Sequence, residues 1–263
     1  MAEAARQSTF ATYPDLAGKV AVVTGGSKGI GAATCRALAA NGVKVAVVAR
    51  DQAAIDRTVA SLTDAGGHAI GVSINAMDYA EVDQLRRRVE GELGPTDILM
   101  PFAGGFAKLT PVAEITEEDW RYVIDSNLTA TFFACKSFLP GMQQRGRGSI
   151  VTMASNVARN IDVILTASYA AAKAGIVQFT RHVAKEVGPS GVRINCIAPG
   201  TTVTERVSAI MTDERLEQMS ELSSLKRIGM PDDSAMAALF LASDSASFLT
   251  GITIDVAGGR VMR

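Results

Sequence analysis

Short apolar runs rich in Val, Ile and Ala recur along this chain, and longer amphipathic stretches separate them. The runs have the length of buried strands and lie at 19–24, 43–49, 69–74, 97–101, 149–153, 193–197 and 252–256. The stretches between them have helical periodicity and lie at 32–40, 52–65, 79–92, 117–138, 167 to about 187, and 232–241. Because strands alternate with helices, the pattern predicts an α/β fold with a doubly wound parallel sheet. Ligands of such sheets bind at the carboxyl ends of the strands.

Local signals mark where several of these helices begin and end. Asp78 with Glu81 resembles a capping box in front of the third predicted helix. Thr116 is a candidate N-cap for the long helix at 117–138, and Pro140 is expected to stop that helix.

The composition is that of an ordinary globular protein, with 48% hydrophobic and 20% charged residues among 263. A net charge of −1 gives no electrostatic reason to expect nucleic acid or an anionic membrane as a partner. No apolar run reaches the ~20 residues of a membrane helix, and the polar N-terminus lacks the apolar core of a signal peptide. Three scattered cysteines predict no disulfide framework, and two histidines without ligand spacing predict no metal. We expect a cytoplasmic protein.

The chain shows no linker between domains. Residues 1–15 are expected to form a loose N-terminal extension, and 16–263 a single domain. The stretch at about 201–224 lacks a strand pattern and is interpreted as a substrate lid, with a peripheral packing helix as the alternative. Its apolar residues are Val203, Val207, Ile210, Met211, Leu216 and Met219.

A glycine-rich turn joins the first strand to the first helix, with the sequence Gly25-Gly26-Ser27-Lys28-Gly29-Ile30-Gly31. Glycines let the backbone approach a pyrophosphate, and the helix N-terminus offers unpaired N–H groups. The strand–turn–helix context therefore favours a phosphate site over a turn that serves packing alone.

The second strand ends in Ala49-Arg50-Asp51, where an NAD-binding chain would carry an acid for the ribose. Arg50 and Lys28 suit a 2′-phosphate instead, which predicts NADP(H) as the cofactor. Charge-assisted hydrogen bonds of ~1.5–3 kcal/mol each would favour NADPH by roughly tenfold to a few hundredfold. The alternative is a solvated Arg50 beside Asp51.

Tyr169 and Lys173 stand four residues apart in an Ala-rich stretch, which places them on one face of a helix. Free tyrosine has a pKa near ~10, and lowering it to ~7 takes roughly 4 kcal/mol. One cation at ~4 Å with an effective dielectric of ~20 supplies about that much. The pair is a candidate acid–base site, although the same spacing occurs in ordinary helices with a surface lysine.

Taken together, these motifs resemble the short-chain dehydrogenase/reductase family over about residues 16–259. The residues that carry the resemblance are, in order, Thr24-Gly-x-x-x-Gly29-x-Gly31, Asn127, Ser155, Tyr169-x-x-x-Lys173 and Pro199-Gly200. The resemblance implies a Rossmann-type domain with a seven-stranded parallel sheet in the order 3-2-1-4-5-6-7 and helices on both faces. It also implies a nicotinamide cofactor and a homotetramer or homodimer, paired through the helices that carry Asn127 and Tyr169.

The resemblance assigns a role to each of four catalytic residues. Tyr169 would give a proton to the carbonyl oxygen of a ketone, and Ser155 would orient that carbonyl. Lys173 would lower the pKa of Tyr169 and hold the nicotinamide ribose. Asn127 would bend its helix and hold a water that relays protons to Lys173; from the residues alone, Asn127 could equally face solvent.

The resemblance also implies which residues contact the cofactor. They are Gly25, Ser27, Lys28, Gly29, Ile30, Gly31, Arg50, Asn75, Ala76, Ala103, Gly104, Tyr169, Lys173, Pro199, Gly200, Thr202 and Thr204. Two positions depart from the family pattern. Pro101-Phe102 replaces the usual Asn-Asn pair, which puts the local sheet bonding in question, and Asn75 replaces an Asp that contacts adenine.

The leading functional hypothesis is an NADPH-dependent oxidoreductase that reduces a mainly hydrophobic ketone to a secondary alcohol. The alternative is a 3-oxoacyl-carrier-protein reductase, although Ser190 stands where those enzymes tend to carry a basic residue. Arg145 and Arg147 either meet an acidic carrier protein or are solvated turn charges. A non-catalytic NADP-binding scaffold is a third reading, against which the intact Ser, Tyr, Lys and Asn set argues.

Overall fold

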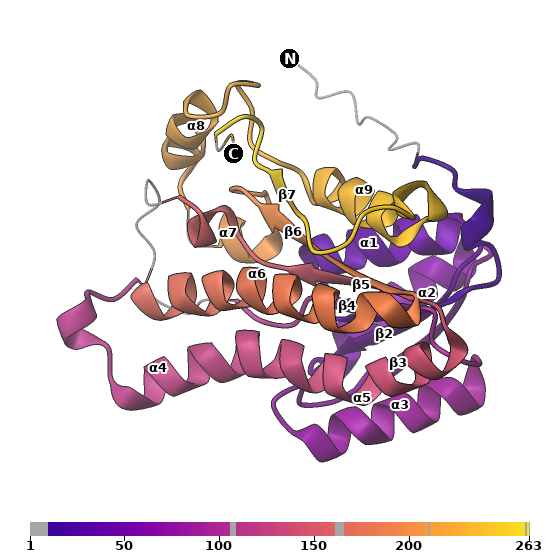
Figure 1. The fold of residues 1–263 in the computed structure, drawn as a ribbon. Coiled ribbons are helices and arrows are strands. Elements are labelled where there is room, and N and C mark those ends of the chain that lie inside the picture. The colour runs from indigo at the N-terminus through magenta and orange to yellow at the C-terminus, as the bar shows by residue number, and fades with distance from the viewer. Residues whose placement is uncertain (1–9, 106–108, 161–165, 210, 261, 263) are drawn as a thin grey trace.

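Seven parallel strands form one sheet in the order β3-β2-β1-β4-β5-β6-β7 in this computed structural model (Figure 1). The structure describes residues 10–105, 109–160, 166–209, 211–260 and 262. The strands are β1 Val20–Thr24, β2 Lys44–Ala49, β3 His68–Ser73, β4 Ile98–Pro101, β5 Gly148–Met153, β6 Val192–Pro199 and β7 Thr253–Val256. The expected fold class and strand order are confirmed.

Helices cover both faces of the sheet. They are α1 Gly29–Ala40, α2 Gln52–Asp64, α3 Tyr79–Glu92, α4 Glu117–Ile124, α5 Ala130–Arg145, α6 Ala167–Val187, α7 Glu205–Ser208, α8 Asp213–Glu221 and α9 Pro231–Ala242. Helices α1, α2 and α9 pack on one face and α3, α5 and α6 on the other (Figure 1). Among the described helices, none has the length and apolarity to cross a membrane.

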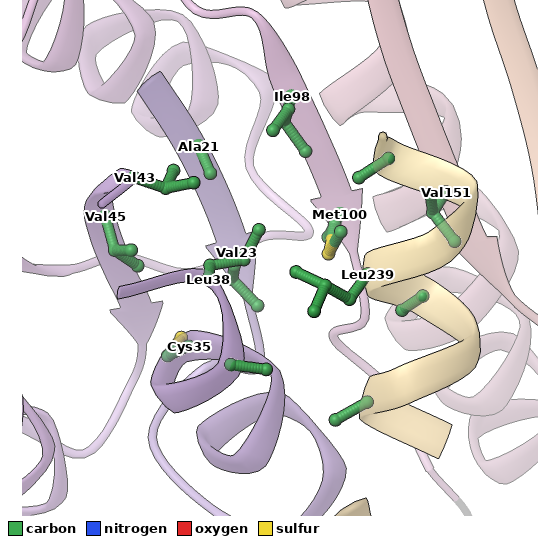
Figure 2. Packing of buried hydrophobic residues seen from close by; sticks show 14 of the residues in the cluster. Ala21, Val23, Cys35, Leu38, Val43, Val45, Ile98, Met100, Val151 and Leu239 are labelled. Carbon is green, nitrogen blue, oxygen red and sulfur yellow. The ribbon is translucent and has the colours of Figure 1, made fainter. Parts of the chain in front are cut away.

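The core on the α1/α9 face is built from side chains that alternate along the strands. Figure 2 shows Val23 of β1 and Met100 of β4 facing Leu38 of α1 and Leu239 of α9. All four side chains are fully buried, and each such burial stabilises the fold by roughly 1.5–3 kcal/mol. The opposite face of the sheet packs into a second core, so both faces of the strands are buried. The strand sequences are therefore continuous apolar runs rather than alternating apolar and polar residues.

Helix α5 does not stop at Pro140, so this expectation was wrong. The helix runs on to Arg145 and ends at Gly146, which adopts the left-handed conformation typical of a helix C-terminus. Phe138 before the proline and Met142 after it are both buried in the core under α3 and α6. Their burial offsets the cost of about 3 kcal/mol that a proline imposes inside a helix.

The N-caps of two other helices follow the sequence only in part. Thr116 accepts a hydrogen bond from the Asp119 N–H at 3.0 Å, as expected. Asp78 accepts from the backbone of α3, but the Glu81 carboxylate binds the Asn75 N–H at 2.8 Å instead of returning to Asp78. The capping box is therefore half formed, and Glu81 fixes the loop that carries Asn75.

The N-terminal extension is less loose than expected where the structure describes it. The backbone N–H of Tyr13 donates to the Asn41 side chain at 2.7 Å, and Asn41 donates to the Ala11 carbonyl at 3.0 Å. Phe10 and Tyr13 pack against the core around α1. The domain's packing therefore begins before residue 16, whereas residues 1–9 lie outside the described part of the chain.

Pro101 and Phe102 shorten the pairing of β4 with β5. The β4–β5 register covers only Ile98 and Leu99, whereas β1 pairs with β4 as far as Pro101. Proline has no N–H to donate to a ladder. Phe102 is buried, and its N–H is held by the Thr24 carbonyl at 3.1 Å. The departure from Asn-Asn costs local sheet pairing but keeps the loop after β4 fixed to β1.

Candidate active site

A cavity of about 620 Å³ opens at the carboxyl ends of the strands. Loops that follow β1 to β6 line it, together with α6 and α7. All seventeen residues expected to contact a cofactor belong to this lining, and so does Ser155. The parallel sheet thus gathers motifs that lie up to 180 residues apart in sequence into one cleft, from Gly25 to Thr204.

The glycine turn builds an anion-binding site at the N-terminus of α1. A Cβ at Gly31 would overlap the Gly25 carbonyl, so only glycine lets the helix start this close to β1. The Gly29 N–H donates to the Glu205 carboxylate at 3.1 Å. A carboxylate oxygen thus occupies the position that a phosphate oxygen would take. The donor set and the close approach fit a dinucleotide pyrophosphate.

Two cations, Lys28 in the glycine turn and Arg50 after β2, line the same cleft. The Lys28 ammonium pairs with Asp51 at 2.8 Å, and this hydrogen bond lowers the pKa of the Asp51 carboxyl. The Arg50 guanidinium lies 3.4 Å from the Tyr122 hydroxyl. Asp51 also caps α2. The acid is therefore held by Lys28 rather than by Arg50, which remains directed toward the cleft lining.

Asn75 follows β3 and lines the same end of the cavity. Its side-chain oxygen accepts the Met77 N–H at 3.1 Å, and its own N–H is held by Glu81. A carboxamide oxygen has two lone pairs, so one remains for an adenine amino group.

Ser155, Tyr169 and Lys173 meet where β5 ends against the start of α6. The Thr166 side chain caps α6 by accepting the Tyr169 N–H at 3.4 Å. The Lys173 ammonium donates to the Met153 carbonyl at 2.9 Å and lies 5.5 Å from the centre of the Tyr169 ring. A side-chain hydrogen bond joins Tyr169 to Ser155. The three polar groups expected to do the chemistry are therefore in one place.

Burial controls the protonation of this group. It raises the pKa of Tyr169 to about 12, and the hydrogen bond with Ser155 and the charge of Arg206 oppose that rise only in part. It lowers the pKa of Lys173 to about 8, with the Arg206 charge acting in the same direction. Burial thus outweighs the effects that lower the pKa of Tyr169, and the expected contribution of Lys173 to that pKa stays a prediction.

Asn127 lies in a π-helical segment and does not belong to the described cavity lining. Residues Asp125–Thr129 form a π-helical segment between α4 and α5, and Asn127 in its middle is fully buried. The Asn127 side chain accepts the Gly105 N–H at 3.0 Å and donates to the Gly105 carbonyl at 2.9 Å. It thus fixes the loop after β4, and the solvent-facing alternative is excluded.

The segment after β6, which the sequence analysis interprets as a substrate lid, forms a wall of the cleft. Thr204 caps the short helix α7, whose Glu205 and Arg206 reach the lining together with Val207. Met211 joins the wall, and Met219 of α8 is buried. Ile210 lies outside the described residues. That this segment moves as a lid remains a prediction.

Comparisons with known proteins agree with this architecture. The family model described as enoyl-(acyl carrier protein) reductase matches residues 25–260. A 3-oxoacyl-[acyl-carrier-protein] reductase of Synechocystis sp. is 40% identical over 252 residues, which cover 94% of this chain and 98% of the relative. A 3-oxoacyl-[acyl-carrier protein] reductase with bound NAD from Brucella melitensis aligns with a TM-score of 0.86 at 32% identity, over 95% of this chain and 94% of that one.

A second solved structure widens the range of relatives. A 7α-hydroxysteroid dehydrogenase complexed with NADH and 7-oxo glycochenodeoxycholic acid aligns with a TM-score of 0.87 at 31% identity, over 95% of this chain and 97% of that one. Fold, cleft and relatives define an oxidoreductase that interconverts CH–OH and C=O groups with a nicotinamide cofactor. The chain belongs to the short-chain dehydrogenase/reductase family, as the motifs predicted.

The lowered pKa of Lys173 makes stability depend on pH. Lysine ordinarily has a pKa of 10.5, and the folded value is about 8. Between these values the unfolded chain binds more protons, so the free energy of unfolding rises with pH. We expect the free energy of unfolding of the wild type to rise by about 2 kcal/mol between pH 7 and pH 9.5, relative to that of Lys173→Met. Urea denaturation of both proteins measures the gain, and a flat or falling difference contradicts it. The range stays below the ordinary tyrosine pKa of 10.0, above which Tyr169 acts in the opposite sense.

Glu205 competes with any phosphate for the Gly29 N–H. We expect Glu205→Gln to lower the Kd for a reduced nicotinamide dinucleotide by roughly two- to fivefold at low salt, because an exposed negative charge is removed from an anion site. Fluorescence of the bound dinucleotide measures the Kd. Glu217→Gln on α8 is the control, since Glu217 does not belong to the described cavity lining. Weaker binding by Glu205→Gln would show that the carboxylate assists the cofactor.

Proposed function

We propose that this protein is an NADPH-dependent reductase that converts a ketone to a secondary alcohol, with Tyr169 as the proton donor. The observation that carries the proposal is the meeting of Ser155, Tyr169 and Lys173 in a cleft that is also lined by the anion-binding turn. A bound nicotinamide cofactor supplies the hydride to the carbonyl carbon.

The residues of the chain handle the oxygen. As the carbon–oxygen double bond breaks, its electron pair moves to oxygen, and the hydroxyl of Tyr169 donates its proton there. Ser155 donates a hydrogen bond that holds the carbonyl in line with Tyr169. Lys173, with its ammonium beside the ring, stabilises the tyrosinate that is left.

The raised pKa of Tyr169 agrees with its proposed role as the proton donor. Its pKa of about 12 keeps the hydroxyl protonated at neutral pH, which a proton donor needs and a proton acceptor does not. Lys173, with a pKa near 8, is partly neutral at slightly alkaline pH.

Lys28 and Arg50 support NADPH rather than NADH as the cofactor. Both cations line the end of the cleft at the carboxyl end of β2, where the ribose lies in doubly wound sheets. A 2′-phosphate would meet both cations, and it would compete with Asp51 for Lys28.

The substrate that we propose is mainly hydrophobic. Val207 and Met211 give the wall beside Arg206 an apolar character. Reduction of a bulky free ketone agrees with the 7-oxo steroid in the structure of one relative.

A 3-oxoacyl thioester on a carrier protein is the second candidate, which the names of the relatives favour. The structure removes one argument for it, because Arg145 and Arg147 lie at the opposite edge of the sheet. Arg145 donates to the Thr96 carbonyl, and Arg147 stands 3.6 Å from Asp97, both next to the start of β4. Their position beside the start of β4 therefore does not support a role in binding a carrier protein at the cleft.

We also propose a homodimer or homotetramer in the cytoplasm. Trp120 and Phe132, on α4 and α5, are each about two-fifths exposed, and an unpartnered apolar helix face supports pairing with a second copy. All three cysteines are free and buried, which suits a reducing compartment.

Turnover tests the proposal directly. We expect NADPH consumption, followed at 340 nm, with bulky ketones or a 3-oxoacyl thioester. Tyr169→Phe should lower kcat/KM by roughly 10²- to 10⁴-fold and leave NADPH binding in place, because only the proton donor is lost. NADPH binding without turnover across the panel would instead indicate a scaffold.

Cofactor choice is tested by a double variant. We expect Lys28→Ala with Arg50→Ala to raise KM for NADPH by roughly tenfold to a few hundredfold more than KM for NADH, because only NADPH carries the 2′-phosphate. Steady-state kinetics with each cofactor gives both values. Equal effects on the two cofactors would remove the assignment.

A further inference from the structure

Arg206 brings a positive charge to the reacting end of the cleft. It is the second residue of α7 and is exposed, and its guanidinium Nη1 lies 3.3 Å from the Gly104 carbonyl. It belongs to the cavity lining with Ser155, Tyr169 and Lys173. Its charge also lowers the pKa of both Tyr169 and Lys173, which places the guanidinium within electrostatic reach of the proton donor.

The loop after β4 leaves room for this guanidinium. Gly105 has a φ of +147°, and a Cβ built there would overlap Nη1 of Arg206. Asn127 holds Gly105 by both its N–H and its carbonyl. Asn127 thus fixes Gly105 at the point where the Arg206 guanidinium enters the cleft, and the missing side chain of Gly105 leaves room for that guanidinium.

No carboxylate in the described cavity lining neutralises Arg206. The lining carries two carboxylates. Asp51 pairs with Lys28 at the far end, and Glu205 is bound to the Gly29 N–H. Arg206 therefore presents a guanidinium that donates to the Gly104 carbonyl, in a cleft whose lining has a net positive charge.

We propose that Arg206 is a specificity residue that binds an anionic group, a carboxylate in the simplest case, carried by the ketone substrate. A guanidinium matches a carboxylate with two parallel hydrogen bonds, which fixes orientation as well as affinity. The apolar neighbours Val207 and Met211 would take the rest of the substrate, so the substrate class is an amphipathic keto acid. This inference rests on the proposed function and names its substrate.

The test compares acids with their esters. Levulinate and longer straight-chain keto acids are assayed beside their methyl esters, with saturating NADPH, and the measured quantity is the ratio of kcat/KM for acid to ester. We expect the wild type to prefer the acid and Arg206→Gln to lower the ratio by roughly 10- to 100-fold. Arg206→Lys should give an acid-to-ester ratio between those of the wild type and Arg206→Gln, because it keeps the positive charge. Arg215→Gln, an exposed arginine of α8 outside the described lining, is the matched control.

Each outcome decides the inference. A ratio that Arg206→Gln leaves unchanged overturns it, and so does an effect that falls on the Kd for NADPH instead, since Arg206 would then serve the cofactor. If the wild type reduces neither acid nor ester, the proposed function fails for these ketones. Calorimetric titration of the NADPH-bound protein with the keto acids then tests the site alone. Binding that Arg206→Gln abolishes supports the inference, and equal or absent binding overturns it.

Discussion

Covering both faces of a parallel sheet with helices leaves the carboxyl edge of the strands as the place where polar chemistry can gather. Every strand of the sheet ends in the same direction, so six successive loops converge on one cleft. The unpaired N–H groups at the start of α1 open into it and bind an anionic oxygen, here the Glu205 carboxylate. The apolar cores under α1 and α9 and under α3, α5 and α6 hold that edge rigid. The site depends on the sheet, and the sheet depends on the two cores.

Local sequence patterns predicted most of the fold, because burial in the two cores requires apolar runs in the strands and amphipathic periodicity in the helices. The helix expected at 79–92 has those bounds, and the strand order follows from the family resemblance. The errors arose where distant contacts decide. Pro140 is a breaker by local rules, yet the burial of Phe138 and Met142 against α3 and α6 carries α5 past it. Tyr13 and Phe10 belong to the domain because Asn41, far along the chain, binds the backbone beside them.

The sequence predicted which residues line the site, but it did not predict their burial or the direction of the Tyr169 pKa shift. Motif positions named the residues of the lining, but spacing gives no depth of burial, and burial moves the Tyr169 pKa upward rather than downward. The Asn127 side chain binds Gly105, and the expected water that relays protons to Lys173 stays a prediction. Glu205 and Arg206 were missed because their importance depends on where the backbone runs after Pro199-Gly200. The available sequence signal was an acid and a base directly after the candidate helix cap Thr204.

The charged residues of the cleft fall into two groups, one at the end expected to bind the ribose and one at the end expected to carry out the reaction. Lys28 and Arg50 stand at the ribose end, and Lys173 and Arg206 at the reacting end, with Asp51 and Glu205 bound at or near the glycine turn. Burial lowers the pKa of Lys173, and the Arg206 charge acts in the same direction. The Arg206 charge also lowers the pKa of Tyr169, which favours a tyrosinate as the proton leaves. An anionic group on Arg206 would relieve the repulsion on Lys173 and raise its pKa. If the substrate carries the proposed anionic group, its charge therefore influences the protonation of Lys173.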